Sequence, residues 1–374
     1  MRDPRHAQLA KLLVTHSVQL NPGESCLIQT SEVPGDLVEA IIEAVYDAGA
    51  YPHVKLTLEG VSRSLLLGAS EESLASWAAC DAYQMERMDA FIGVRGFNNH
   101  RELSDVPEAQ MKLYMNCYNT PVHQEIRVPK TKWVVLRYPT PSMAYMAGMS
   151  TRAFEEFYYQ VTTGVDYRTM AKAMEPVKTF LDSSDRVHIL GPETDLKFSI
   201  KGMTSVPCYG IRNIPDGEIY TAPVLESMQG KVAYNTPSTY QGTTFTGVSF
   251  EVKEGKIVSA RANRQERIDA ILDTDKGARY FGEFALGVNP SIINPMDETL
   301  FDEKIMGSFH LTPGNAYKEC FNGNKSSVHW DLVSIQTPQY GGGEIWIDGV
   351  LVRRDGVFVH EAFSGLNPEH LVQA

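Results

Sequence analysis

Helix-like and strand-like patterns of apolar residues alternate over the first half of the chain. Across residues 33–48, Leu37, Ile41, Ile42 and Val45 recur at the spacing of one helix face, and a glycine follows as a natural stop. The other predicted helices are 7–16, 71–88, 108–116, 151–162 and 167–181, and the predicted strands are 26–28, 51–58, 89–94 and 133–136. This rhythm predicts a mostly parallel sheet with helices on its faces.

The pattern changes after residues 183–185, where short strands separated by turn signals replace the long helices. Pairs of an acidic residue and glycine, typical of tight hairpins, occur at 216–217, 254–255, 348–349 and 355–356. One helical stretch, residues 265–272, interrupts the strands. We therefore expect an α/β protein with an N-terminal parallel-sheet domain over residues 1–182 and a strand-rich α+β domain over residues 183–374.

Composition narrows the possible partners. The net charge of −12 argues against nucleic acid and against an anionic membrane surface, because both need patches of Lys and Arg. The five cysteines are odd in number and far apart, which is typical of reduced thiols. We find no signal-peptide pattern and no apolar stretch long enough to span a bilayer, so we expect a cytoplasmic protein.

A histidine and an aspartate two residues apart are the first candidate for chemistry. His329 and Asp331 lie in an apolar run typical of a strand, where such residues share a face and could share a metal ion. The spacing alone is weak, because 10 histidines and 46 acidic residues among 374 positions give about one His-x-acid by chance. The chain has three, with histidines at 100, 123 and 329. A hydrogen-bonded structural pair is the alternative interpretation.

Three more segments carry candidate ligands. His310 follows Gly307-Ser308-Phe309, and with His329 and Asp331 it would form a two-histidine, one-carboxylate set that suits zinc or iron. Glu218 follows a Pro-Asp-Gly turn, and Glu283 is embedded among small and apolar residues. A buried glutamate needs a partner, which could be a metal, an arginine or backbone amides. The chain has no phosphate-loop pattern and no G-x-S-x-G elbow.

Taken together and in order, these segments resemble the thermophilic-type metalloaminopeptidases, the family of bacterial aminopeptidases S and T. The matching segments are PDGEIYTAP (215–223), GARYFGEFALG (277–287), GSFHLTPGNAY (307–317) and NKSSVHWDLV (324–333). The resemblance extends over most of the chain through YPTPSMAYMAGMS (138–150), TDLKFSIKG (194–202) and IDGVLVRRDGVFV (347–359). It differs in the short stretch between Tyr317 and His329, which concerns the shape of a loop.

The resemblance implies a two-metal site in the C-terminal domain. The implied metal ligands are Glu218, Glu283, His310, Tyr317, His329 and Asp331, with Glu283 as the expected bridging carboxylate. Three carboxylates and two divalent ions sum to one positive charge, which favours a metal-bound hydroxide. A tyrosine ligand would need a nearby cation to lower its pKa from about 10.

The function that follows is that of a metal-dependent aminopeptidase. A metal-bound hydroxide at the two-metal centre would attack the first peptide bond of peptides with a free N-terminus, using zinc, cobalt, manganese or magnesium. The resemblance also implies a homodimer. One alternative is a single-metal iron dioxygenase that cleaves rings on the same scaffold, and another is a binding protein without catalysis. The full set of six ligands favours the aminopeptidase.

Overall fold

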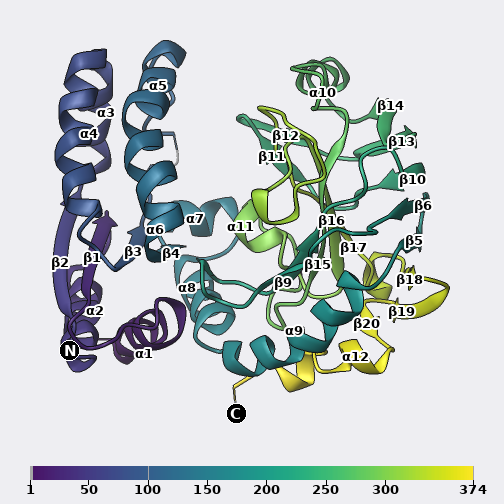
Figure 1. The fold of residues 1–374 in the computed structure, drawn as a ribbon, viewed down its shortest axis with the longest axis horizontal. Helices are drawn as coiled ribbons and strands as arrows, with labels where there is room; N and C mark the ends of the chain where they lie inside the picture. Colours follow the sequence, from purple (N-terminus) through teal and green to yellow (C-terminus); the bar gives the residue numbers. More distant parts are fainter. Residues whose placement is uncertain (1–2, 100, 374) are drawn as a thin grey trace. The chain divides into compact units, whose positions relative to one another are not determined.

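The chain folds into two compact units, each with its own sheets and helices. The computed structural model describes residues 3–99 and 101–373. The first unit comprises the chain up to Thr163 together with the later segment Gly210–Ile214. The second unit comprises Gly164–Tyr209 and the chain from Pro215 onward (Figure 1). Helix α9 (Tyr167–Asp182) belongs to the second unit, because it packs against elements of that unit. The sequence-based boundary at residue 183 lies after this helix.

The first unit is built on a five-stranded parallel sheet, which confirms the prediction from the alternating pattern. Its strands, in spatial order, are β2 (Tyr51–Thr57), β1 (Ser25–Ser31), β3 (Ala90–Arg95), β4 (Lys132–Arg137) and β8 (Asn213–Ile214). Cys26, Leu27 and Ile28 of β1 are all buried, as expected for a parallel strand with both faces covered.

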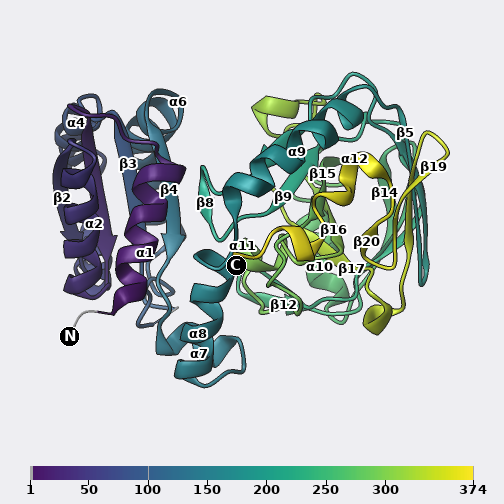
Figure 2. The same cartoon turned by 90° about the horizontal axis from the view of Figure 1, so that it is seen from below.

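Helices flank this sheet. They are α1 (Pro4–Leu12), α2 (Gly35–Asp47), α3 (Glu59–Leu67), α4 (Glu71–Met85), α5 (Glu108–Tyr114), α6 (Val128–Lys130), α7 (Pro141–Met146) and α8 (Thr151–Thr162), with π-helical stretches η1 (Leu13–Ser17) and η2 (Met115–Arg127). Figure 2 shows α1 and α2 running alongside the strands. On one face, Leu74 of α4 and Val122 of η2 pack with Leu27 and Phe91 of the sheet. Helix α3 was not predicted, because its three leucines are consecutive and do not mark one helix face; two of them, Leu65 and Leu67, are exposed.

The second unit contains two antiparallel sheets and a short ribbon. The eight-stranded sheet has the order β14 (Lys256–Arg261), β13 (Ser249–Lys253), β10 (Gln229–Ala233), β6 (Thr194–Ser199), β5 (Arg186–Gly191), β18 (Glu344–Ile347), β19 (Val350–Arg354) and β20 (Val357–Phe358). The five-stranded sheet has the order β17 (Leu332–Ile335), β16 (Ser308–Pro313), β15 (Phe281–Gly287), β9 (Glu218–Thr221) and β7 (Val206–Cys208). The ribbon pairs β11 (Ser238–Tyr240) with β12 (Thr243–Phe245).

Aromatic side chains join the two sheets of the second unit. The rings of Phe198 on β6 and Phe284 on β15 meet edge to face with centroids 5.0 Å apart.

The other helices of this unit are α10 (Gln265–Leu272), α11 (Thr299–Asp302), α12 (Glu361–Ser364), η3 (Lys318–Cys320), η4 (Pro338–Tyr340) and η5 (Pro368–His370). Among the residues that the structure describes, none of the helices has the length and apolar character needed to cross a membrane.

Three of the four predicted hairpins are confirmed. The pairs 254–255, 348–349 and 355–356 form two-residue loops between antiparallel strands, and all six residues have positive φ, as type I′ turns require. The hairpin predicted at Asp216-Gly217 is wrong. The strand before it, β8, pairs in parallel with β4 of the first unit, whereas β9 after it pairs with β15 of the second. This turn is therefore a crossing between sheets.

Candidate metal centre

Three strands of the five-stranded sheet bring two glutamates and a histidine onto one face. Glu218 begins β9 and pairs with Gly287 of β15, while His310 of β16 pairs with Ala285. Because alternate residues of β15 share a face, Glu283 lies on the same side, diagonal to His310. The small residues at 285 and 287 leave room above the sheet for the larger side chains. All three site residues are buried.

His329 and Asp331 come from the segment just before β17. Asp275 holds the preceding residues, since its carboxylate accepts a hydrogen bond of 2.8 Å from the Ser326 hydroxyl and one of 2.8 Å from the Ser327 amide. His329 forms an isolated bridge with Gly314, which follows β16. This arrangement carries His329 and Asp331 to the edge of the face that holds the other three candidate ligands.

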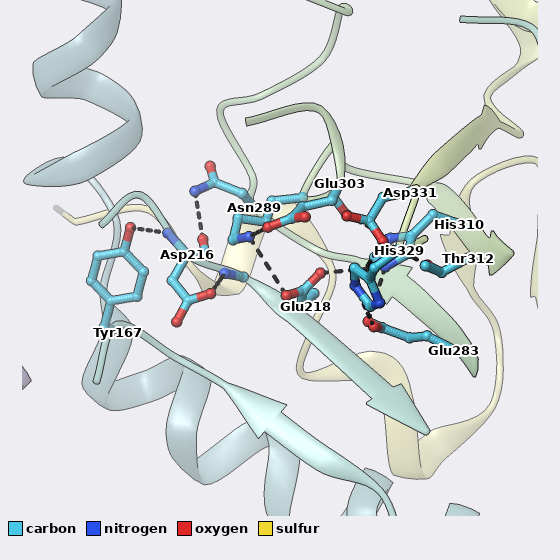
Figure 3. A network of polar contacts seen from close by, with 12 residues as sticks. Tyr167, Asp216, Glu218, Glu283, Asn289, Glu303, His310, Thr312, His329 and Asp331 are labelled. Atoms are coloured by element: carbon cyan, nitrogen blue, oxygen red, sulfur yellow. Dashed lines mark hydrogen bonds and ion pairs between the residues drawn. The ribbon is translucent and has the colours of Figure 1, made fainter. Parts of the chain in front are cut away.

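Two clusters of possible ligands share the carboxylate of Glu283 (Figure 3). One oxygen of Glu283 lies 3.1 Å from Nε2 of His310, which is itself 3.8 Å from Oε2 of Glu218. The other oxygen lies 3.6 Å from Nε2 of His329, which is 3.5 Å from Oδ1 of Asp331. In each cluster the ligand atoms lie within 4.8 Å of one another.

Backbone carbonyls orient both histidines toward the carboxylates. Nδ1 of His329 donates to the carbonyl oxygen of Asn315 at 2.9 Å, and Nδ1 of His310 faces the carbonyl oxygen of Glu303 at 3.3 Å. A carbonyl can only accept, so Nδ1 of each ring carries a proton. Each Nε2 therefore faces the carboxylate cluster, where a charged ring donates its second proton to a carboxylate and a neutral ring would offer a lone pair to a metal ion.

The charges of the site are strongly coupled. Burial opposes the positive charge of His310, but hydrogen bonding to Glu283 and the charges of Glu283, Glu218 and Asp331 outweigh it and raise its pKa to about 10. The pKa of Glu218 is raised well above its ordinary value, chiefly by burial. For Asp331, burial acts in the same upward direction, but the two histidines lower its pKa below the ordinary value.

Tyr317 lies at the margin of this group. It is 43% exposed, and its ring contacts the rings of His329 and Tyr220, with centroids 4.7 and 5.6 Å away. Although part of the side chain is exposed, its phenol group is buried, and this burial and the carboxylates of Glu283 and Asp331 raise its pKa, opposite to the shift expected beside a cation. The contact with His329 puts Tyr317 next to the cluster, and its role as a ligand stays a prediction.

Sequence reasoning missed Lys304 and Glu303. The ammonium of Lys304 is completely buried, contacts a carboxylate oxygen of Glu303 and lies 3.5 Å from Oε1 of Glu218. Burial opposes its charge, but Glu218, Glu303 and Asp216 outweigh burial and raise its pKa well above the ordinary value. The available signal was the charged triplet 302–304 within an otherwise apolar stretch that leads to His310.

The donor set fits divalent metal ions. Oε2 of Glu218 and Oε2 of Glu283 are buried and have no hydrogen-bond partner among the described residues. Carboxylate oxygens and imidazole nitrogens are the ligands of catalytic zinc, cobalt and manganese sites. A cation between them would satisfy these oxygens and the Nε2 lone pairs of His310 and His329.

The His-x-acid pair that contains His123 belongs to the first unit, whereas the cluster belongs to the second. His123 is buried in the first unit, where its Nδ1 accepts a hydrogen bond of 3.1 Å from Arg127. His100 lies outside the described residues.

Two glycines of the segment around Glu283 allow close approach of other backbone. A Cβ on Gly282 would lie 2.2 Å from the carbonyl oxygen of Asn315, the group that accepts from His329. A Cβ on Gly287 would lie 2.3 Å from the carbonyl oxygen of Ile305, next to Lys304. Both positions therefore need glycine for steric reasons.

Comparison with known proteins gives a consistent result. A family described as thermophilic metalloprotease (M29) matches residues 2–351. Aminopeptidase PepS of Streptococcus thermophilus is 24% identical over 392 aligned residues, covering 91% of this chain and 93% of the relative.

Two solved structures resemble this fold over nearly its whole length. Wild-type AmpT from Thermus thermophilus superposes with a TM-score of 0.79 at 24% identity, covering 96% of this chain and 99% of that one. The 2,5-dihydroxypyridine dioxygenase from Pseudomonas putida KT2440 superposes with a TM-score of 0.58 at 14% identity, covering 96% and 98%. Both likenesses concern the fold.

Proposed function

Since this chain belongs to the thermophilic metalloprotease family (M29) and is a metal-dependent aminopeptidase, we propose that it works with two metal ions held in its second unit. Its substrates would be peptides with a free N-terminus, from which it removes the first amino acid. The ligands proposed are Glu218, Glu283, His310, His329 and Asp331, with Tyr317 completing one coordination shell.

The shared carboxylate of Glu283 is the observation that carries this proposal. Its two oxygens face different histidines, and each histidine has a further carboxylate of its own. Glu283 would therefore bridge two ions, one with Glu218 and His310 and the other with His329 and Asp331. A single-metal site would not need both clusters.

When bound, the two ions would supply Lewis acidity that activates a water molecule and stabilises the charge developing on the peptide carbonyl. The residues of the chain would hold this arrangement rigid. The Asn315 carbonyl orients His329, and the Thr312 hydroxyl donates to Asp331 at 2.6 Å.

Lys304 would favour the ionised form of Glu218, against the burial that raises its pKa, and would hold its carboxylate in place. Its ammonium stands beside Glu218 and Glu303 in a fully buried position. The charges of Lys304 and Glu303 cancel. The net charge of three carboxylates and two divalent ions is therefore still one positive charge, which favours a bound hydroxide. The hydroxide, the metal's identity, the cytoplasmic location and the homodimer remain predictions.

The proposal is tested by cleavage of N-terminal leucine and arginine anilides. Metal-stripped protein would be assayed alone and after addition of zinc, cobalt or manganese, and bound metal would be counted by mass spectrometry. We expect two ions per chain, activity restored by metal, and no cleavage of N-acetylated substrates.

Two variants sharpen this test. Glu283→Gln should bind fewer than two ions and lose activity, whereas Glu251→Gln, whose side chain on β13 is 47% exposed, should behave as the parent. One ion per chain in the active parent would contradict the bridge. Absence of cleavage with every metal, together with oxygen uptake on a dihydroxypyridine, would replace the aminopeptidase with the dioxygenase.

A further inference from the structure

Two arginines stack on one tryptophan in the first unit, away from the metal ligands in the sequence and in a different sheet. The guanidinium carbons of Arg127 and Arg212 lie 4.4 and 4.9 Å from the centre of the Trp133 ring. Arg127 also lies 5.3 Å from the ring of Phe91, which is the direct neighbour of Trp133 across β3 and β4. The rings of Phe91 and Trp133 thus lie against a cluster of arginines.

Two donors in this cluster are buried without an acceptor. Nη1 of Arg127 and Nε1 of Trp133 have no hydrogen-bond partner within the part of the chain that the structure describes. The Nε of Arg127 is used, since it donates to Nδ1 of His123 at 3.1 Å. A buried donor left unsatisfied costs about 1–3 kcal/mol, and more when the group is charged. Both atoms are donors only, so an acceptor is what they lack.

Positive charge accumulates at the same place. Burial, together with the charges of Arg95 and Arg212, lowers the pKa of Arg127 to about 10. Burial and the same arginine cluster lower the pKa of His123 to about 4, so this histidine is neutral at pH 7. Asp81, the nearby carboxylate, is already paired with Lys55 and Tyr118. Among residues 3–99 and 101–373, no carboxylate forms an ion pair with Arg127.

We propose that Arg95, Arg127, Arg212 and the indole N–H of Trp133 form a binding site for an oxyanion, the carboxylate or phosphate group of a small ligand. Guanidinium groups match the oxygens of both groups with paired hydrogen bonds. Arg95 and Arg212 are exposed and open the site to solvent, while Arg127 and Trp133 supply the buried donors. A water molecule could accept the hydrogen bonds but would leave the positive charge of Arg127 without an anionic partner.

The proposal is tested on the full chain by isothermal titration calorimetry and by tryptophan fluorescence, in a low-salt buffer free of phosphate and carboxylate. Inorganic phosphate is one probe and N-acetylglycine is the other, with N-acetylglycine amide as its uncharged counterpart. We expect saturable binding of one anion per chain, and no binding of the amide. Binding of phosphate only would assign a phosphate site, and binding of N-acetylglycine only would assign a carboxylate site.

Variants distinguish binding at this site from non-specific attraction of anions to arginines elsewhere on the protein. Arg127→Met and Arg212→Gln should each weaken binding at least tenfold, whereas Arg87→Gln should leave it unchanged. Arg87 is a matched control, because its guanidinium lies 3.4 Å from the ring of Tyr83 in the same unit. Arg212→Gln is exposed and tests the proposal even if Arg127→Met fails to fold. Absence of binding by both anions, or equal binding by the parent and all three variants, would overturn it.

Discussion

Single side chains behind the ligands set the geometry of the site. Thr312 is fully buried on β16, and its hydroxyl donates to Asp331 at 2.6 Å. The hydrogen bond fixes which carboxylate oxygen faces His329. Groups that orient ligands in this way are worth about 10–100-fold in metal affinity or activity.

Thr312→Val should therefore lower metal affinity by about 10–100-fold with little change in shape, because valine fills nearly the same volume. The measurement is metal titration of stripped protein, followed by anilide cleavage at saturating metal. Thr179→Val, at an exposed position of α9 in the same unit, is the control. Parent-like affinity in Thr312→Val would mean that Asp331 is held by other contacts.

Lys304 is a buried charge whose loss should be costly. Lys304→Met would leave Glu218 and Glu303 without their counter-charge, and breaking a buried ion pair costs about 3–5 kcal/mol. We expect a clearly lower midpoint in urea for the stripped protein. Lys231→Met removes an equal charge from a pair with Glu251 whose side chains are 68% and 47% exposed, so it should change the midpoint little. Equal effects of the two variants would refute a special role for Lys304.

At the scale of elements, strand β15 approaches the loop around Asn315 so closely that only glycine fits at position 282. In Gly282→Ala the new methyl would meet the Asn315 carbonyl at 2.2 Å. We expect a loss of about 1–3 kcal/mol in the free energy of unfolding, as for other overpacked sites, and weaker metal binding because His329 loses its acceptor. Gly60→Ala in α3 meets nothing within 4 Å and should be neutral or slightly stabilising. Unfolding in urea compares the two.

The loop that carries His329 depends on a single acidic residue at a turn. Burial acts to raise the pKa of Asp275, but hydrogen bonds from Ser327, Ser326 and Gly277 outweigh it and lower the pKa to about 2. Because the folded pKa lies below the ordinary value of 3.8, Asp275 stabilises the fold above pH 3.8, and this contribution is lost as the pH falls toward 2.

Asp275→Asn should therefore lower the thermal midpoint at pH 6 and flatten its decline between about pH 4 and pH 2. Calorimetric scans across this range provide the measurement. Asp47→Asn, at an exposed position near the end of α2, carries the same change of charge and should keep the slope of the parent. An unchanged slope in Asp275→Asn would show that the turn does not depend on this carboxylate.

At the scale of the whole molecule, the proposed metal ligands all belong to one of two compact units. A metal ion that binds only the folded state stabilises the part of the protein that holds it, by about 2.7 kcal/mol at a concentration 100 times its Kd. The first unit has its own buried cluster around Phe91 and Tyr118 and contributes none of the ligands.

Removal of metal with a chelator should therefore lower the unfolding temperature of the second unit more than that of the first. Differential scanning calorimetry would resolve this, with hydrogen exchange of β1 and β16 reporting the two units separately. A uniform shift of both units would show that they unfold as one cooperative block. Restoring the metal should reverse the change.

Local patterns predicted those parts of the fold that local forces determine. The three loops of an acidic residue followed by glycine form type I′ hairpins. The positive φ angles that this turn needs are adopted by the two loop residues themselves, so the prediction did not depend on distant parts of the chain. The parallel sheet was predictable because strands buried on both faces are short and apolar. The turn at 216–217 has the same local chemistry but joins different sheets, which only the pairing partners β4 and β15 decide.

The sequence by itself determined the family, the fold class and a set of ligand types, through segments such as GEFALG and SFHLTPG whose chemistry is local. Only the tertiary structure decided that Glu283 faces two histidines and that Lys304 stands beside Glu218. It alone also joined Arg127, Trp133 and Arg212. The physical reason is that the partners of a buried charge or donor come from residues distant in the chain. The free-energy cost of leaving such a group unpaired arises only when the assembled core excludes water from it.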